Sequence, residues 1–196
     1  MNDTTPQDYH VTRDLRGRLK RHKPLVIWFS GLSGSGKSTI ANQVEKELYS
    51  MKIHTYTLDG DNIRRGINKD LGFSQEDRTE NLRRIAEIAK LFMDSGAVVI
   101  SAFITPLESD RELIRTIIGK ENFIEVFVNT SLEECERRDV KGLYTKARKG
   151  EIQNFTGISS PFEKPKKSHI VLNTEKENIK ESGRRLLDII LPKINL

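Results

Sequence analysis

A glycine-rich loop between a buried strand and a helix limits the fold of this chain more than any other feature of its sequence. Residues 25–30, LVIWFS, are apolar up to the final serine, as in a strand buried on both faces of a parallel sheet. Residues 31–39, GLSGSGKST, follow directly and match the pattern G-x-x-x-x-G-K-[ST]. In this position the loop amides and the N-terminus of the next helix wrap around a polyphosphate. We therefore expect a nucleoside triphosphate at Gly31, Ser33, Gly34, Ser35, Gly36, Lys37, Ser38 and Thr39.

Two side chains of this loop are expected to act on the phosphates. A lysine at the position of Lys37 reaches the β and γ phosphates, and a hydroxyl at the position of Ser38 binds the accompanying Mg²⁺. We therefore predict ATP with Mg²⁺ here, with Lys37 as a catalytic residue and Ser38 as the metal ligand. The motif does not decide whether the phosphoryl group passes to water or to an acceptor molecule.

Strands alternate with helices along the rest of the chain. This alternation predicts a parallel sheet that is covered by helices on both faces. Further strands are expected at 53–58, 97–102, 123–128 and 168–173, and helices at 11–23, 37–51, 74–95, 106–118, from 131, and from 174 towards 191. Three of these helices carry a capping pair at their start: Ser74 with Asp77, Ser131 with Glu134, and Thr174 with Glu177.

Length and charge indicate how the chain is divided. At 196 residues it suits one domain, which we place at 25–196, after a basic N-terminal arm at 1–24. The formal net charge is +5, and residues 10–24 alone hold six Lys or Arg against one acid. Such a run is usually a solvated face, but a nucleotide-dependent protein whose arm contacts nucleic acid stays an alternative. The polar segment 140–167 is too poor in apolar residues for a core and is expected to be a mobile lid over the site.

The sequence also indicates a compartment. The only cysteine, Cys135, excludes an intramolecular disulfide and a cysteine-based zinc site. No stretch approaches the roughly 20 apolar residues of a membrane span, and the first residues lack the apolar core of a signal peptide. We therefore expect a soluble, cytoplasmic protein without membrane contact.

A second polar cluster follows the strand expected at 53–58. Residues 59–65, DGDNIRR, lie at the carboxyl end of that strand, where ligands bind in such sheets. A carboxylate there can orient or deprotonate an acceptor hydroxyl, and the arginines can hold an anionic acceptor. Arg78 and Asn81, three residues apart, share one face of the following helix.

Two absences favour a kinase for a small molecule. The strand expected at 97–102 has Ile100 and Ser101 near its end, whereas hydrolytic motors and switches have an acidic residue at this place. The sequence also has no Asn-Lys-x-Asp motif, which recognises guanine. A lid also suits a phosphotransferase, which must exclude water during transfer. The expected fold is therefore α/β, a P-loop kinase-like parallel sheet with helices on both faces and a mobile lid.

Longer blocks carry a more specific resemblance. GLSGSGKST, DGDNIRRGINKDLGFSQEDRTENLRR, SAFITP and KGLYTKARKGEIQNFTGISSPFEKP together resemble the adenylyl-sulfate kinase family over roughly residues 10–195. The resemblance implies transfer of the γ-phosphoryl group of ATP to the 3′-hydroxyl of adenylyl sulfate (APS), in sulfate assimilation, by a homodimer with Mg²⁺. A related P-loop kinase for a nucleoside monophosphate or a sugar acid stays an alternative.

The resemblance also implies roles for particular residues. Phe73 and an aromatic of the lid, Phe155 or Phe162, suit stacking on adenine, and Arg64 and Arg78 suit the phosphosulfate. Asp61 is the candidate for orienting or accepting the proton of the 3′-hydroxyl. The implied APS contacts are Asp61, Asn62, Ile63, Arg64, Phe73, Arg78, Asn81, Ile104, Thr105, Lys141, Asn154 and Phe155.

Two further assignments concern ATP, and two departures from the family concern APS. Asp59 is a candidate for supporting Mg²⁺ indirectly, and Arg138, with Arg137, for bordering the ATP adenine.

Thr105, counted among the catalytic residues, stands where the family usually has a serine that is described as a phosphorylated intermediate. Its extra methyl group restricts the rotamer, so we favour direct in-line transfer. Arg65 replaces a more usual histidine.

Overall fold

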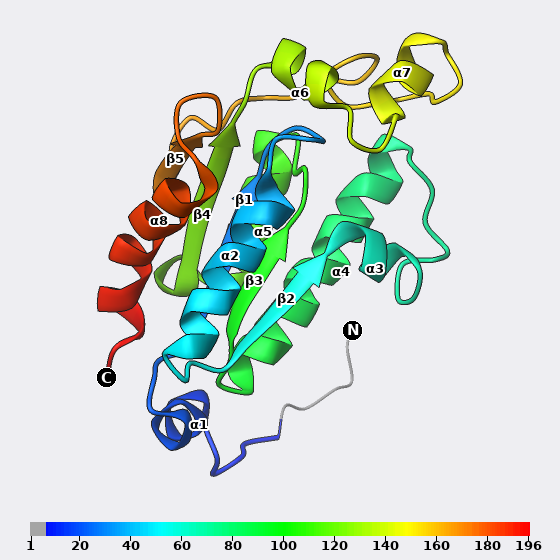
Figure 1. Ribbon diagram of the computed structural model, residues 1–196. Coiled ribbons are helices and arrows are strands. Elements are labelled where there is room, and N and C mark those ends of the chain that lie inside the picture. The colour runs from blue at the N-terminus through cyan, green and yellow to red at the C-terminus, as the bar shows by residue number, and fades with distance from the viewer. Residues whose placement is uncertain (1–6) are drawn as a thin grey trace.

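The computed structural model describes residues 7–196 and builds them around a five-stranded, entirely parallel sheet (Figure 1). The strand order is β2-β3-β1-β4-β5. The strands are β1 (Leu25–Ser30), β2 (Thr55–Asp59), β3 (Val98–Ala102), β4 (Phe123–Asn129) and β5 (Ile170–Asn173). This confirms the α/β class expected from the alternation of strands and helices.

Helices connect the strands and cover both faces of the sheet, with α2 and α8 on one face and α4 and α5 on the other (Figure 1). The helices are α1 (Arg13–Lys20), α2 (Lys37–Ser50), α3 (Gly60–Arg64), α4 (Gln75–Asp94), α5 (Glu108–Ile118), a 3₁₀ turn η1 (Lys120–Asn122), α6 (Leu132–Arg138), α7 (Leu143–Arg148) and α8 (Ile179–Ile194). No helix within residues 7–196 is both long and apolar enough to cross a bilayer.

The core lies on both sides of β1, all of whose residues are buried. Side chains alternate across the strand: Ile27 packs with Ile40 and Val44 beneath α2, whereas Trp28 belongs to the cluster of α4 and α5. A strand that is apolar on both faces can be stable only in this central position, which is why its sequence lacks the usual alternation.

The chain changes direction along the sheet at β1. Strand β3 pairs with one side of β1 and β4 with the other. In such sheets the ligand crevice lies at this switch point, beyond the carboxyl ends of the strands. The glycine-rich loop begins there, and α6 and α7 lie beyond the same edge (Figure 1).

Two of the three predicted capping residues are confirmed. The hydroxyl of Ser74 accepts a hydrogen bond from the amide of Asp77, and α6 begins with a Ser131 cap. The reciprocal half of the first capping box is absent, because the Asp77 carboxylate accepts from the amide of Gly72 (3.0 Å). Asp77 thereby ties the preceding turn to the helix.

The predicted cap of the last helix is wrong. Helix α8 begins four residues later, with Asn178 and Glu181 forming a complete capping box. Thr174 instead donates its hydroxyl to the carbonyl of Ser35 in the glycine-rich loop (3.1 Å). A threonine followed by Glu177 has the local pattern of a cap, but the tertiary contact with the loop takes the hydroxyl.

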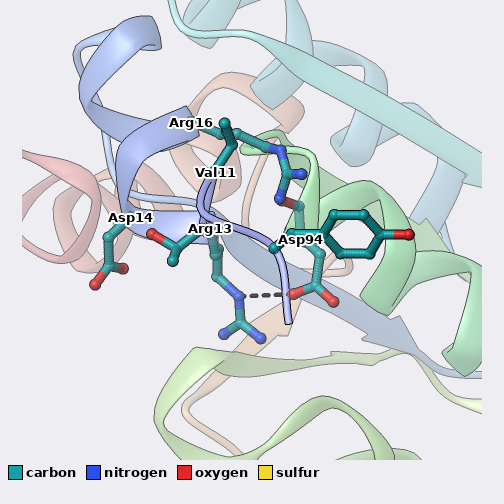
Figure 2. A pocket seen from close by; sticks show the side chains of 7 residues that line it. Val11, Arg13, Asp14, Arg16 and Asp94 are labelled. Carbon is teal, nitrogen blue, oxygen red and sulfur yellow. Dashed lines mark hydrogen bonds and ion pairs between the residues drawn. The ribbon is translucent and has the colours of Figure 1, made fainter. Parts of the chain in front are cut away.

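The basic arm is bound to the C-terminal end of α4 (Figure 2). Arg13 pairs with Asp94 (2.7 Å), Arg16 donates to the Asp94 carbonyl (3.1 Å), and Lys20 donates to the Ser95 carbonyl (2.8 Å). Cations at a helix C-terminus satisfy its free carbonyls and complement its dipole. Three of the six basic residues of the arm therefore have a structural role, and its helix is shorter than predicted. Residues 1–6 of the arm lie outside the described residues.

Candidate active site

A cavity of about 670 Å³ lies at the carboxyl edge of the sheet. Its walls come from the glycine-rich loop, the start of α3, the first turns of α4, the loop after β3 and the segment after α6. One cavity thus brings together most of the residues predicted for the two substrates. These are Ser33, Gly34, Gly36, Lys37, Ser38, Thr39, Asp61, Arg64, Phe73, Arg78, Asn81, Ile104, Thr105, Lys141 and Phe155.

Some predicted residues do not line this cavity. Ser35 is buried beneath the loop, and Ile63 packs against the core cluster of α4 and α5. The others outside the lining are Gly31, Asn62, Arg138 and Asn154. A local motif identifies a stretch of chain, but alternate residues of a stretch point away from the ligand.

The glycine-rich loop is held in its curved shape by close packing. Gly31 has φ 145°, and a Cβ there would stand 2.6 Å from the carbonyl oxygen of Val128. Two hydroxyls, from Thr130 and Thr174, both donate to the carbonyl of Ser35 at 3.1 Å. The amides of Gly31 and Ser35 donate to backbone carbonyls, whereas those of Gly34 and Gly36 make no hydrogen bond within residues 7–196 and can face phosphate oxygens.

Lys37 is buried at the start of α2. Its Nζ donates to the carbonyl of Leu32 (2.7 Å), so the side chain lies back over its own loop. Burial lowers the pKa of Lys37 to about 8, because the ammonium group loses hydration. Anionic phosphates at this loop would offset that loss.

Ser38 and Asp59 join the ends of two neighbouring structural elements. The Ser38 hydroxyl donates to Asp59 Oδ2 (3.2 Å), and Asp59 also caps α3 by accepting from the Asp61 amide (3.0 Å). Within residues 7–196 no group of three or more His, Cys, Asp or Glu residues could hold a metal ion alone. A single hydroxyl with one carboxylate behind it fits Mg²⁺, which is usually bound by few protein ligands together with phosphates and water.

The lid reaches the predicted acceptor residues through Lys141. Its ammonium group forms an ion pair with the Asp61 carboxylate, and both side chains are exposed. Asp61 stands in the first turn of α3, directly after β2. The ion pair thus connects the segment after α6 to the start of α3, and both of its residues line the cavity.

Two arginines surround Phe73 on the wall formed by α4. The Arg64 guanidinium lies 4.4 Å from the centre of the Phe73 ring and donates to the Gly72 carbonyl (3.0 Å). Arg78 donates to the Thr156 hydroxyl (2.8 Å) and to the Asn154 carbonyl. Burial lowers the pKa of both arginines, so an anionic ligand would supply charge that this wall lacks.

Thr105 is held in a strained backbone conformation. Its φ is 47°, which β-branched residues rarely adopt, and the residue is 1% exposed. Its hydroxyl accepts from Trp28 Nε1 (2.9 Å), and its carbonyl accepts from the buried Arg111 (2.9 Å). Sequence reasoning missed Trp28 and Arg111, because each lies in an ordinary strand or helix pattern.

The lid segment 140–167 contains a small core, contrary to the prediction that its apolar content was too low. Helix α7 places Tyr144 and Ala147 on one face, where they are buried with Phe155 against Leu32 and Cys135. The Tyr144 hydroxyl also donates to the carbonyl of Ser33 in the glycine-rich loop (2.9 Å). Few apolar residues suffice because the loop and α6 supply the other half of the cluster.

The structure distinguishes between the two aromatic residues proposed for stacking in the lid. Phe155 lines the cavity and packs edge-on against Tyr144, with ring centres 5.0 Å apart. Phe162 stacks against Phe127 instead, at 6.1 Å, and is not part of the cavity wall. Phe155 is therefore the lid aromatic placed to contact a ligand.

Arg138 lies behind the glycine-rich loop. It donates to the hydroxyl and the carbonyl of Thr174, both at 3.0 Å, and pairs with Glu134 (2.8 Å). Arg137 pairs with the same Glu134 on the exposed side. Other wall residues that sequence reasoning missed are mostly apolar or small, such as Gly60, Leu82, Phe103, Pro106, Val140, Leu143, Ile152, Gln153 and Thr156.

Comparisons with known proteins agree on one family. Residues 23–173 match the family model described as Adenylylsulphate kinase. An adenylyl-sulfate kinase of Bacteroides thetaiotaomicron is 58% identical over 187 residues, which are 95% of this chain and 93% of that protein. The structure of the Mycobacterium tuberculosis APS kinase CysC in complex with AMPPNP and APS has a TM-score of 0.84 and 47% identity, over 86% of this chain and 98% of that one. A hexameric APS kinase from Thiobacillus denitrificans has a TM-score of 0.67 and 25% identity, over 89% of this chain and 30% of that one. The chain belongs to the adenylyl-sulfate kinase family.

Proposed function

We propose that this protein transfers the γ-phosphoryl group of ATP to the 3′-hydroxyl of adenylyl sulfate, giving ADP and 3′-phosphoadenylyl sulfate in sulfate assimilation. The observation that carries the proposal is the single cavity that joins the glycine-rich loop to Asp61, Arg64, Phe73 and Arg78. A triphosphate on the loop and an anionic nucleotide against α4 would share this space. The family and its structure with AMPPNP and APS support the same pair of substrates.

On the donor side, the loop amides and Lys37 bind the phosphates. Ser38 would be the ligand for Mg²⁺, and Asp59 holds that hydroxyl in place. When bound, Mg²⁺ neutralises charge on the β and γ phosphates. Arg138, beside Ser35, borders the donor nucleotide from behind the loop.

On the acceptor side, Asp61 orients the 3′-hydroxyl and accepts its proton as the new P–O bond forms. Phe73 and Phe155 face the adenine ring, and Arg64 and Arg78 hold the phosphosulfate. Thr105 shapes the wall through its backbone. Its hydroxyl is buried against Trp28, which supports direct transfer between the two nucleotides rather than a phosphorylated threonine.

The segment 140–167 acts as a lid in this proposal. Lys141 pairs with Asp61, and Arg78 binds Asn154 and Thr156, so the lid contacts the acceptor wall at two places. Opening these contacts would admit adenylyl sulfate, and closing them would exclude water from the transfer.

We further propose a homodimer that works in the cytoplasm, with neither nucleic acid nor membrane as a partner. The binding of Arg13, Arg16 and Lys20 to α4 supports a structural role for the arm over contact with a polyanion. One relative, the APS kinase from Thiobacillus denitrificans, is a hexamer. Sedimentation of the purified protein measures its assembly directly.

A coupled assay of ADP release tests the function. Adenylyl sulfate, AMP, gluconate and shikimate are offered in parallel with ATP and Mg²⁺, and we expect turnover with adenylyl sulfate alone. Turnover with AMP or a sugar acid but not with adenylyl sulfate would refute the proposal. Salt-sensitive binding of duplex DNA that stimulates ATP hydrolysis would instead support the nucleic-acid alternative.

A further inference from the structure

A buried polar contact links the turn after α3 to the acceptor wall. Asn68 is 0% exposed, and its Nδ2 donates to Asn81 Oδ1 at 3.0 Å. The same Nδ2 lies 3.4 Å from the backbone carbonyl oxygen of Asn81. Asn81 itself is 6% exposed and lines the cavity.

The backbone carbonyl determines how both amides are oriented. A carbonyl oxygen only accepts hydrogen bonds, so the Asn68 atom that faces it must be the NH₂ group. That NH₂ group then requires Asn81 to turn its own oxygen towards Asn68. Within residues 7–196 no hydrogen bond engages Asn81 Nδ2, so this NH₂ group remains as the unused donor of a side chain that lines the cavity.

We propose that Asn68 is a positioning residue, which holds the Asn81 amide so that it presents NH₂ and not C=O to adenylyl sulfate. The inference rests on the proposed function. The oxygens of the phosphosulfate and the ring nitrogens of adenine are hydrogen-bond acceptors. Arg64 and Arg78 on the same wall are donors with no acceptor capacity. A carbonyl oxygen of Asn81 would be repelled by an acceptor at this wall, whereas its NH₂ group completes the set of donors.

The turn does not need the Asn68 side chain for its own shape. The Asn68 amide donates to the Ile63 carbonyl (3.2 Å), and the Asn68 carbonyl accepts from Leu71 (3.2 Å). Arg84 ties the turn to α4 by binding Asp70 (2.9 Å). Asn68 Oδ1 is buried without a partner among the described residues, which is unfavourable for folding. An unpaired oxygen lowers the stability of the fold, so we attribute the presence of the Asn68 amide to its effect on the orientation of Asn81.

The first test removes the amide. In Asn68→Leu, Asn81 is free to turn, and we expect the KM for adenylyl sulfate to rise by about 10- to 100-fold, the loss typical of a hydrogen bond to a charged group. The KM for ATP should stay within about twofold, because the glycine-rich loop is untouched. Arg84→Gln is the matched control: it loosens the same turn without touching Asn81, and it should leave the KM for adenylyl sulfate near the wild-type value.

The second test uses pH to reverse the hydrogen bond. In Asn68→Asp, a protonated carboxyl can still donate to Asn81 Oδ1, whereas an ionised one can only accept and turns the Asn81 amide round. Full burial can raise the pKa of an aspartate from about 4 to about 7–9, and position 68 is fully buried. The ratio of the variant's KM for adenylyl sulfate to that of the wild type should therefore increase between pH 6 and pH 8.5. The charged groups that hold the turn on α4 are Arg84, Asp70 and Glu80. Arg84 forms an ion pair with each of the two carboxylates. The pKa of both carboxylates is lowered, chiefly by hydrogen bonds from arginines, so they remain ionised throughout this range.

A double-mutant cycle completes the test. In an Asn81→Ala background, Asn68→Leu should change the KM for adenylyl sulfate by less than about twofold, since no amide remains to orient. A full effect in that background, an equal effect of Arg84→Gln, or a KM ratio for Asn68→Asp that stays near one at pH 8.5 would overturn the inference. Failure of the unmodified protein to phosphorylate adenylyl sulfate would instead refute the proposed function, so the two failures are distinguishable.

Discussion

The ionisation of Lys37 illustrates how burial acts on a single residue. The ammonium group has lost its hydration and donates to the Leu32 carbonyl, with its pKa lowered to about 8. Phosphate oxygens favour the charged form, so the pKa must be higher when ATP is bound. The free protein is therefore partly deprotonated at mildly alkaline pH, and ATP binding restores the proton.

We expect ATP affinity to weaken as the pH rises above about 8, because binding must then take up a proton at Lys37. The slope should approach about tenfold in Kd for each pH unit. Calorimetry at pH 7 to 10, in buffers with different ionisation enthalpies, measures both the affinity and the proton uptake. Lys37→Arg, which stays charged, should bind ATP without this proton uptake. Equal proton uptake by the two proteins would contradict the assignment.

Asp61 is exposed and carries the role of proton acceptor in the proposal. Asp61→Asn preserves the shape of the side chain but cannot accept a proton. We expect turnover to fall by about 10²- to 10⁴-fold, the usual contribution of a general base. ATP affinity should remain near the wild-type value, because Asp61 faces the acceptor. Steady-state kinetics with separate ATP titration checks both parts, and a wild-type rate would remove Asp61 from the mechanism.

The buried hydroxyl of Thr105 predicts a separation of stability from turnover. Thr105→Ala leaves Trp28 Nε1 without its acceptor, so the free energy of unfolding should fall by about 1–3 kcal/mol. Turnover should persist, because direct transfer needs no hydroxyl at this position. Thr105→Ser, which retains the hydroxyl, should recover most of the stability. Complete loss of activity in Thr105→Ala, together with phosphothreonine in the wild type by mass spectrometry, would support the covalent route.

Helix α4 is the element that connects the acceptor wall to the arm. Its first turns carry Arg78 and Asn81, and its last turn binds Arg16 of the arm. Gly96 follows the C-cap Ser95 with φ 88°, and a Cβ there would lie 3.0 Å from the backbone of Arg16. The absence of a side chain at Gly96 allows the two elements to approach.

Gly96→Ala should lower the free energy of unfolding by about 1–3 kcal/mol, because it adds both backbone strain and a clash with the arm. Gly150→Ala is the matched control, since Gly150 also has a positive φ (76°) but nothing lies within 4 Å of a Cβ there. Denaturant titration of both variants measures the difference. Equal stability of the two variants would show that the arm does not pack on α4 in this way.

In the whole molecule, the two edges of the sheet have different roles. The cavity occupies the carboxyl edge, whereas the buried His22 and the exposed His169 each join two segments at the amino edge. His22 Nε2, ahead of β1, accepts from the amide of His54 (3.1 Å), and His169 Nδ1, ahead of β5, accepts from the amide of Glu125 (3.0 Å). Both bonds need an unprotonated ring nitrogen, and desolvation lowers the pKa of both histidines.

The free energy of unfolding should therefore decrease as the pH falls below about 6.5, the ordinary pKa of histidine. A lowered folded-state pKa gives stability that is complete above 6.5 and is lost as the pH falls through the folded value. His22→Gln and His169→Gln supply an amide oxygen as the acceptor and should flatten this dependence. Denaturant unfolding at pH 5 to 8 measures it, and subtracting the variant curve removes the contribution of the carboxylates. Parallel curves for wild type and variants would exclude the histidines as the cause.

Local spacing explains why much of the site could be predicted from the sequence. The pattern from Gly31 to Ser38 lies within eight consecutive residues. Asp61 follows the end of a recognisable strand, and Arg78 follows the start of a recognisable helix. The prediction failed where a distant segment changed the role of a residue. Thr174 has the pattern of a helix cap but binds Ser35, and the lid gains its core only from Leu32 and Cys135.

The sequence by itself determined the parallel sheet, the phosphate loop and the polar groups at its edge, because these depend on periodicity and on residues close together in the chain. The tertiary structure alone decided that Asn68 faces Asn81, that Trp28 and Arg111 hold Thr105, and that Arg78 binds Thr156. The contacts of Trp28 with Thr105 and of Arg78 with Thr156 join positions more than 70 residues apart. Such contacts have no local pattern, because they exist only once the strands have aligned and the helices have packed against them.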